Sequence, residues 1–125
     1  MSVPVDLAAL KEQVAEHGDV AFLVTSAGDG GPHVVSVRLA WDGDRLVLPA
    51  GKSTLANVPA HPAVTLLWPS GGDPSYCLIA DAVVVATDDD ARTITVEPTH
   101  AILHRLADAD ASIPYCRQLT EPAGG

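Results

Sequence analysis

Three of the seven basic residues of this chain lie between positions 38 and 52, namely Arg38, Arg45 and Lys52. Lys52 is followed directly by two hydroxyl residues, Ser53 and Thr54, where a short helix is expected to begin. Unpaired amides at a helix start, together with a lysine and two hydroxyls, can bind an anion such as phosphate. The alternative is that Ser53 or Thr54 only caps the helix and that Lys52 is solvated.

The tripeptide Gly51-Lys52-Ser53 is similar to the end of a nucleotide-binding P-loop. That motif requires a glycine five residues before Gly51, because its backbone amides surround the phosphates. Position 46 is a leucine, so a P-loop is excluded.

The segment from 33 to 41 alternates as a strand does, with side chains repeating every second residue. One face is apolar, and the other places the hydroxyl of Ser36 beside the guanidinium of Arg38. A partly buried arginine needs an anionic partner. That partner is either the anion of a ligand or a carboxylate of the protein such as Asp42 or Asp44.

The five histidines do not predict a metal site. His100 and His104 share one face of a strand, but four residues of strand separate them by about 13 Å, too far for one ion. His17 and His61 fall at helix ends, and His33, directly after a Gly-Gly-Pro turn, is expected to be structural. The two cysteines, Cys77 and Cys116, have no CxxC spacing and are expected to be free thiols.

Side-chain catalysis also lacks a recognisable residue set, so no catalytic residue is assigned. The sequence has no GxSxG elbow, and Cys77 lies inside an apolar strand, where a thiol is unreactive. If the protein is an enzyme, this favours a cofactor that carries the chemistry.

The elements that must position these residues are mostly strands. Asp6 is expected to cap a helix over 7–17, and a short helix in mid-chain ends at Pro59. Apolar and β-branched runs bounded by turn residues predict six strands, over 20–25, 33–41, 45–49, 63–69, 76–87 and 92–106. Hairpin connections between them favour an antiparallel barrel or sandwich, in a single domain over 1–125 with an irregular tail from about residue 107.

Composition limits the class of partner. Hydrophobic residues make up 47% of the chain and charged residues 18%, as in a globular domain with a buried core. A formal net charge of −9 disfavours nucleic acid and anionic membranes, because their phosphates need cations. The first residues lack a signal-peptide pattern and no apolar run could span a bilayer, so the cytoplasm is expected.

A set of motifs in a fixed order resembles the flavin-binding split β-barrel superfamily named after pyridoxamine 5′-phosphate oxidase, in its small actinobacterial flavin or deazaflavin oxidoreductase type. The resemblance covers about residues 6 to 106 and rests on 22–25, 30–37, Gly51-Lys52-Ser53 with Asn57, 61–67, 76–81 and 96–105.

This resemblance implies a mainly β fold, a six-stranded antiparallel split barrel with an N-terminal helix and a short mid-chain helix. It also implies a homodimer that binds FMN or the deazaflavin coenzyme F420 at the subunit interface. Carried over by position, the residues that bind the cofactor phosphate are on the second strand and at the start of the short helix: Ser36, Arg38, Lys52, Ser53 and Thr54. The residues that line the ring pocket are Val37 and Trp68.

Two departures from the superfamily pattern narrow the activity. The Arg-x-His motif of the true pyridoxamine phosphate oxidases is not matched, because His104 and Arg105 are adjacent and in the opposite order. In the superfamily an arginine usually precedes the Asn of the short helix, but this chain has Ala56 at that position. We expect hydride transfer from a flavin or deazaflavin to a small, planar substrate. The alternative is a non-catalytic module that binds or stores a flavin, haem or tetrapyrrole.

Overall fold

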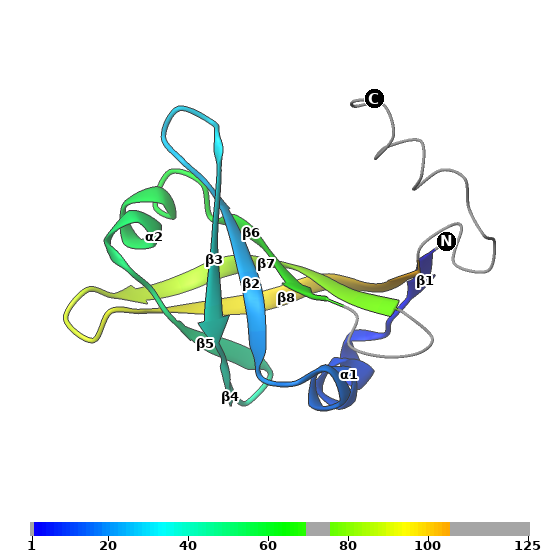
Figure 1. The fold of residues 1–125 in the computed structure, drawn as a ribbon. Helices are drawn as coiled ribbons and strands as arrows, with labels where there is room; N and C mark the ends of the chain where they lie inside the picture. Colours follow the sequence, from blue (N-terminus) through cyan, green and yellow to red (C-terminus); the bar gives the residue numbers. More distant parts are fainter. Residues whose placement is uncertain (1, 70–75, 106–125) are drawn as a thin grey trace, which may run out of the picture.

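The structure, a computed structural model, describes residues 2–69 and 76–105, which form one curled antiparallel sheet with helices at its ends (Figure 1). The helical segments are a 3₁₀ turn η1 (Leu7–Ala9), α1 (Leu10–His17) and α2 (Lys52–Asn57). The strands are β1 (Ser2–Pro4), β2 (Val20–Ser26), β3 (Pro32–Arg38), β4 (Ala40–Asp42), β5 (Arg45–Pro49), β6 (Ala63–Trp68), β7 (Tyr76–Asp88) and β8 (Thr93–Arg105).

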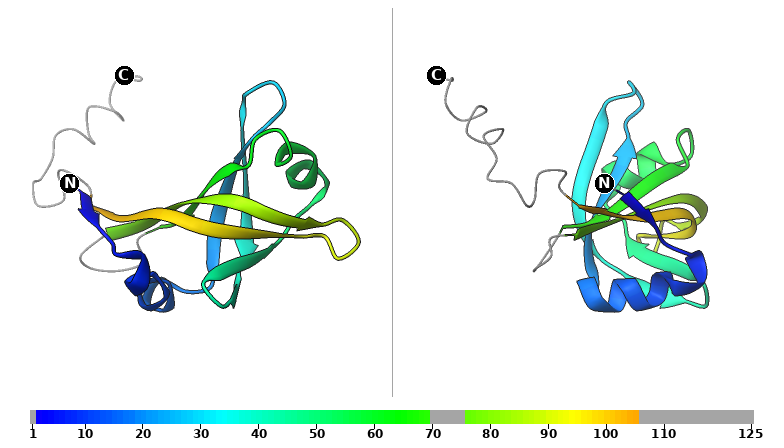
Figure 2. Two further views of the ribbon diagram at one scale, coloured as in Figure 1. Left: turned by 180° about the vertical axis from the view of Figure 1, so that it is seen from behind. Right: turned by 90° about the vertical axis from the view of Figure 1, so that its right-hand side faces the viewer.

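The sheet curls into a half-open barrel, which two further views show (Figure 2). Its strand order is β3-β2-β6-β7-β8-β5-β4, and β1 pairs with β8 outside this path. The β7–β8 ladder has register shifts at Asp81/Ala82 and at Val84/Ala86. Such bulges bend a strand and increase its twist. The bent ladder pairs with β6 on one side and β5 on the other, and the sheet curls until β3 contacts β5.

The predicted mainly β class, with an N-terminal and a short mid-chain helix, is confirmed, but the strand count is not six. Each predicted strand is present, whereas β1 was not predicted and the segment 33–41 forms two strands. They separate at Leu39, whose N–H donates to the carbonyl of Asp19 at 2.8 Å, while its side chain is buried. The chain thereby passes from the β2 side of the barrel to the β5 side. The predicted tail from about residue 107 lies outside the described residues.

The predicted cap at Asp6 is confirmed in position but makes no side-chain bond, and the predicted cap at Ser53 or Thr54 is wrong. Asp6 occupies the N-cap position of η1, but only its backbone carbonyl bonds, accepting from the N–H of Ala9 at 2.8 Å. The N-cap of α2 is Gly51, two residues before the earlier of the two predicted caps, so Ser53 and Thr54 lie inside the first turn. The extended backbone of Gly51 carries the chain directly from β5 into the helix.

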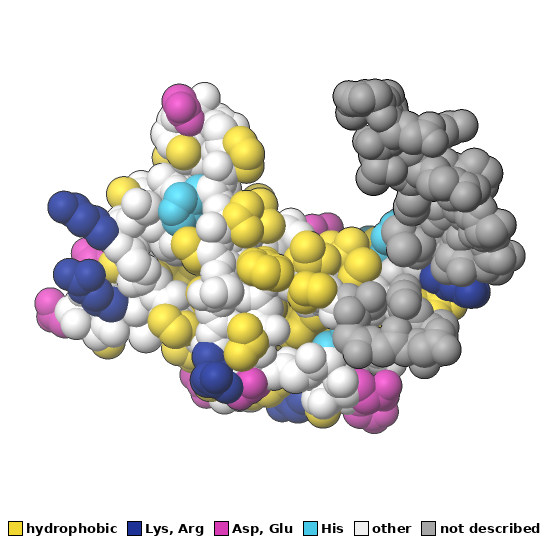
Figure 3. Space-filling model, in the orientation of Figure 1, with side chains coloured by type: hydrophobic (Ala, Val, Ile, Leu, Met, Phe, Trp, Pro, Cys, Tyr) yellow, Lys and Arg dark blue, Asp and Glu magenta, His cyan; other side chains and the backbone are white. Residues whose placement is uncertain are grey.

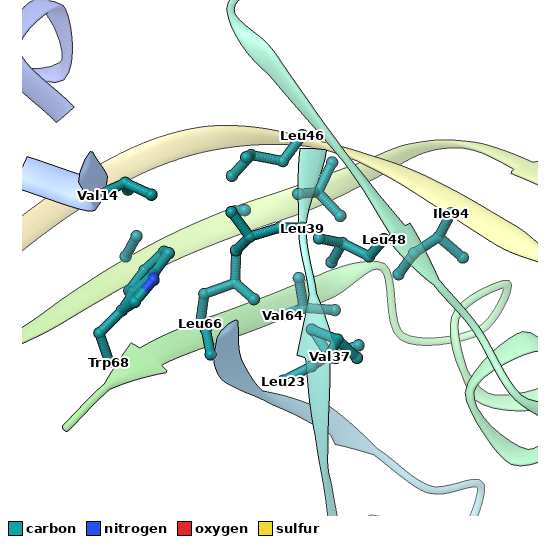
Figure 4. Close-up of a cluster of buried hydrophobic side chains, with 14 of the residues drawn as sticks. Val14, Leu23, Val37, Leu39, Leu46, Leu48, Val64, Leu66, Trp68 and Ile94 are labelled. Carbon is teal, nitrogen blue, oxygen red and sulfur yellow. The ribbon is translucent and has the colours of Figure 1, made fainter. Parts of the chain in front are cut away.

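The core is aliphatic and lies between the concave side of the sheet and α1 (Figure 4). Leu10 and Val14 of α1 pack on it, and Trp68 is its largest fully buried side chain. The indole N–H of Trp68 donates to the carbonyl of Gly18 at 3.0 Å, and this bond joins β6 to the end of α1. Among the described residues, no helix is long and apolar enough to cross a membrane.

Candidate ligand-binding site

A groove of about 640 Å³ lies between β3, the start of α2 and the β7–β8 turn. This volume is within the range of small-molecule sites. Its lining residues are His33, Val35, Ser36, Val37, Pro49, Ala50, Gly51, Lys52, Ser53, Thr54, Ala91 and Arg92. Below, we call it the β3–α2 groove.

Two cations line the β3–α2 groove without a partner inside the protein. In the described part of the chain, Lys52 and Arg92 are the Lys and Arg side chains that make no hydrogen bond, ion pair or ring contact. Both are exposed, and Lys and Arg side chains project together where α2 and the β7–β8 turn lie (Figure 3). With a net charge of −9 on the chain, two unpaired cations at one groove favour an anionic ligand.

The backbone of the β7–β8 turn fixes where Arg92 stands. Arg92 has a φ of 57°, the left-handed region that a non-glycine residue adopts at a cost of about 1–2 kcal/mol. The carboxylate of Asp88 accepts from the N–H of Ala91 at 2.9 Å, and the carbonyl of Arg92 accepts from the N–H of Ala50 at 2.9 Å. These bonds hold the turn against the segment that leads into α2.

The wall of the groove opposite the cations is an edge strand. In the sheet path β3 is hydrogen-bonded to β2 alone, so its other edge offers backbone donors and acceptors to a ligand. Val35 and Val37 point to the inner side of the sheet and supply apolar surface, and Val37 is 7% exposed. A flat, partly apolar ligand with an anionic end matches this combination.

The structure brings together five of the seven predicted cofactor-binding residues. Ser36, Val37, Lys52, Ser53 and Thr54 all line the β3–α2 groove. Their contributions differ, because Ser53 is exposed, whereas the side chain of Thr54 is buried beneath α2.

The other two predicted residues lie elsewhere. Arg38 is not among the groove-lining residues, and its guanidinium bonds both carboxylate oxygens of Asp19 at 2.9 and 3.0 Å. The expected partners of Arg38 within the protein, Asp42 and Asp44, are therefore wrong. Arg38 pairs with Val20 across the β2–β3 ladder, which places it beside Asp19. Trp68 is fully buried in the core and does not line the groove.

Sequence reasoning missed Arg92. Arg92 follows three aspartates and an alanine in a turn, a context that matches no binding motif. The only available signal was that it is one of seven cations in an acidic chain. His33 was expected to be structural, yet it lines the groove at the start of β3.

The described groove-lining residues include no carboxylate, thiol or phenol. His33 is the one histidine among them. Among the described residues, no three His, Cys, Asp or Glu side chains gather as a metal ion would require. The groove offers binding and orientation, so its chemistry would come from a bound group.

A larger groove of about 860 Å³ suits an anion less well. It lies between the N-terminal helical segments and the β4–β5 hairpin, and its two cations are occupied. The Lys11 ammonium donates to the carbonyl of Gly43 at 2.9 Å and lies 4.9 Å from the Trp41 ring centre. Arg45 pairs with Glu97 at 3.1 Å.

The convex face of the sheet carries a continuous apolar row. The ladder registers place Phe22 opposite Leu67, Leu67 opposite Ile79, and Ile79 opposite Ile102. Phe22 is 40% exposed, and Val20 and Val34 on the same face are exposed as well. Figure 3 shows hydrophobic side chains gathered across the middle of this face. Contiguous exposed apolar surface of this kind is typical of protein interfaces.

Comparison with solved structures shows the fold. No protein-family model matches this sequence, and no curated protein matches it significantly. An F420 reductase superposes with a TM-score of 0.59 and 24% identity, covering 72% of this chain and 94% of its own. A proposed pyridoxamine 5′-phosphate oxidase from Listeria innocua superposes with a TM-score of 0.62 and 19% identity, covering 78% of this chain and 98% of its own. An FAD-binding protein from Mesorhizobium loti superposes with a TM-score of 0.62 and 15% identity, covering 82% of this chain and 95% of its own.

These likenesses show that the chain has the split-barrel fold of these structures. The predicted resemblance to the pyridoxamine 5′-phosphate oxidase-like superfamily is thus confirmed at the level of the fold. At these identities the cofactor and the activity have to be argued from the groove itself.

Proposed function

We propose that the β3–α2 groove binds FMN or coenzyme F420, and that the protein is an oxidoreductase acting on a small, planar substrate. The observation that carries this proposal is the pair of unpaired cations, Lys52 and Arg92, at a groove of ligand size. The solved structures of the same fold that bind F420 or FAD support the choice of cofactor class.

The residues present fit a phosphate-bearing planar cofactor. Lys52 and Arg92 would hold the phosphate by charge-assisted hydrogen bonds, which are about twice as strong as neutral ones. Ser53, exposed in the first turn of α2, is a further groove-lining residue with a hydroxyl. Val35 and Val37 would contact the ring, and the free edge of β3 would meet its polar rim. A bound flavin or deazaflavin supplies hydride transfer, and the protein supplies orientation and electrostatics.

We also propose that two copies associate through the convex apolar face to form a homodimer. The row of Phe22, Leu67, Ile79 and Ile102 gives each copy the same self-complementary strip, as a two-fold interface requires. Burial of this row would remove the apolar surface that the single chain exposes.

A non-catalytic module that binds or stores a flavin, haem or tetrapyrrole is the second candidate. The observation in its favour is the absence of carboxylates, thiols and phenols from the described groove lining. The two candidates differ in turnover, because a storage module would bind the cofactor without passing hydride to a second molecule.

Titration of the purified protein with FMN and with F420, followed by absorbance and fluorescence, tests the proposal. We expect saturable binding of at least one of them. After the bound cofactor is reduced with a chemical reductant in the absence of oxygen, addition of a planar acceptor such as a quinone should reoxidise it. Saturable binding without any reoxidation across a panel of acceptors would favour the storage module. Binding of neither cofactor would contradict both the cofactor assignment and the enzyme class.

A further inference from the structure

His33 belongs to a short polar chain that begins beneath the groove. The hydroxyl of Thr25 lies 3.4 Å from Nδ1 of His33, and the amide nitrogen of Asn57 lies 3.5 Å from the same hydroxyl. Thr25 is 2% exposed, so its hydroxyl depends on these partners instead of water. These two hydrogen bonds link α2 to β2, and β2 to His33 of β3, which lines the groove.

The order of donors along this hydrogen-bond chain favours one tautomer of the histidine. The amide nitrogen of Asn57 can only donate, so the Thr25 oxygen accepts from it. The Thr25 hydroxyl keeps its own proton, which it can donate to Nδ1 of His33. A neutral imidazole whose Nδ1 accepts carries its proton on Nε2. In the described part of the chain, Nε2 of His33 has no hydrogen-bond partner.

We propose that His33 is a hydrogen-bond donor of the β3–α2 groove, whose Nε2–H binds an acceptor on the planar ring of the ligand, a carbonyl oxygen or an imine nitrogen. Thr25 and Asn57 are positioning residues that hold this tautomer. The inference rests on the proposed function and adds to it the chemical feature of the ring that the protein recognises.

The position of His33 relative to the cations supports this division of roles. His33 is linked to Asn57 at the C-terminal end of α2, whereas Lys52 begins the helix. Five residues of helix separate the two ends by about 7–8 Å. The groove therefore offers cations at one end and a neutral donor at the other. A ligand with a charged phosphate and a ring with an uncharged acceptor satisfies both.

The tautomer is measured on the ligand-free protein by long-range ¹H–¹⁵N correlation NMR of the histidine rings. We expect His33 to show the Nε2–H form in the wild type. Thr25→Val, which keeps the shape of the buried side chain, should produce a mixture of tautomers, and Thr25→Ser should restore the Nε2–H form. A wild-type ring with its proton on Nδ1, or a ring unaffected by Thr25→Val, would overturn the positioning role.

Ligand recognition is measured with two matched pairs of probes. One pair is FMN and its phosphate-free form riboflavin, and the other is F420 and its phosphate-free deazaflavin core. His33→Leu should weaken binding of both members of a pair by the same factor, about 2- to 12-fold for one neutral hydrogen bond. His33→Gln, whose amide nitrogen also donates, should recover most of that loss. Lys52→Ala should affect only the phosphorylated member.

Two outcomes separate this inference from the proposed function. If the wild type binds a cofactor and His33→Leu binds it equally well, His33 is not a ligand donor and the proposed function stands. If the wild type binds none of the four probes, the proposed function and the ligand role of His33 both fail.

Discussion

The backbone N–H of Ala50 donates a hydrogen bond of 2.9 Å to the carbonyl of Arg92. This bond lies directly beyond the last residue pair of the β5–β8 ladder, Pro49 with Thr93. It ties the entry to α2 to the β7–β8 turn. Lys52, two residues after Ala50, and Arg92 therefore line one groove although forty positions separate them in the sequence.

Replacing Lys52 by alanine should weaken binding of FMN or F420 by about 1.5–3 kcal/mol, the range for a hydrogen bond to a charged group. Arg38→Ala is the matched control, because it removes a cation that is paired with Asp19 and lies outside the groove lining. Isothermal titration calorimetry of both variants checks this. A larger loss for Arg38→Ala than for Lys52→Ala would contradict the location of the phosphate.

Arg92 should contribute to the affinity through its charge. Arg92→Asn removes the charge but tolerates the left-handed backbone, since asparagine is enriched there. We expect weaker cofactor binding with an unchanged melting temperature. Arg92→Lys, which keeps the charge, should retain most of the affinity. Equal binding by the Asn and Lys variants would show that the charge at position 92 does not contact the ligand.

Trp68 should contribute to stability and not to cofactor binding. Trp68→Phe loses the indole bond to Gly18 and leaves a small cavity, so the free energy of unfolding should fall by about 1–3 kcal/mol. Urea denaturation measures the change, and cofactor titration at low temperature measures the affinity. A Trp68→Phe variant with normal stability and weaker cofactor binding would contradict this and would indicate that Trp68 lines the ring pocket.

A charge in the apolar row should abolish the proposed dimer. Phe22→Asp would place a carboxylate in the apolar row of the convex face, where burial without a partner is unfavourable. Leu7→Asp is the control, because Leu7 is equally exposed, at 43%, but lies on η1. Light scattering coupled to size exclusion should give a monomer for the first variant only. A wild type that is monomeric at high concentration would refute the dimer.

Much of the fold is predictable because local sequence determines it. Alternation along 33–41 indicates which face of the strand is buried. The predicted hairpin connection between 33–41 and 45–49 is confirmed, with Gly43 in its turn at a φ of 64°. The break at Leu39 is not predictable in this way. It depends on a hydrogen bond to Asp19, and nothing near Leu39 in the sequence encodes that contact.

The site was predictable only where its residues are neighbours in sequence. Lys52, Ser53 and Thr54 follow one another, and Ser36 and Val37 adjoin on one strand. Arg92 reaches the same groove through a register between distant strands and a left-handed turn, which residue types do not reveal. Arg38 was misjudged for a related reason. Its partner Asp19 precedes the opposite strand, and the β2–β3 register brings the two together.

The most direct test of the account is one titration series with FMN and with F420, using the wild type and the double variant Lys52→Ala/Arg92→Asn. We predict saturable binding of at least one cofactor by the wild type, weakened by rising salt because the contact is between charges. The double variant should bind far more weakly while remaining folded by circular dichroism. Equal affinity and equal salt dependence for the two proteins would contradict the claim that these cations hold the cofactor.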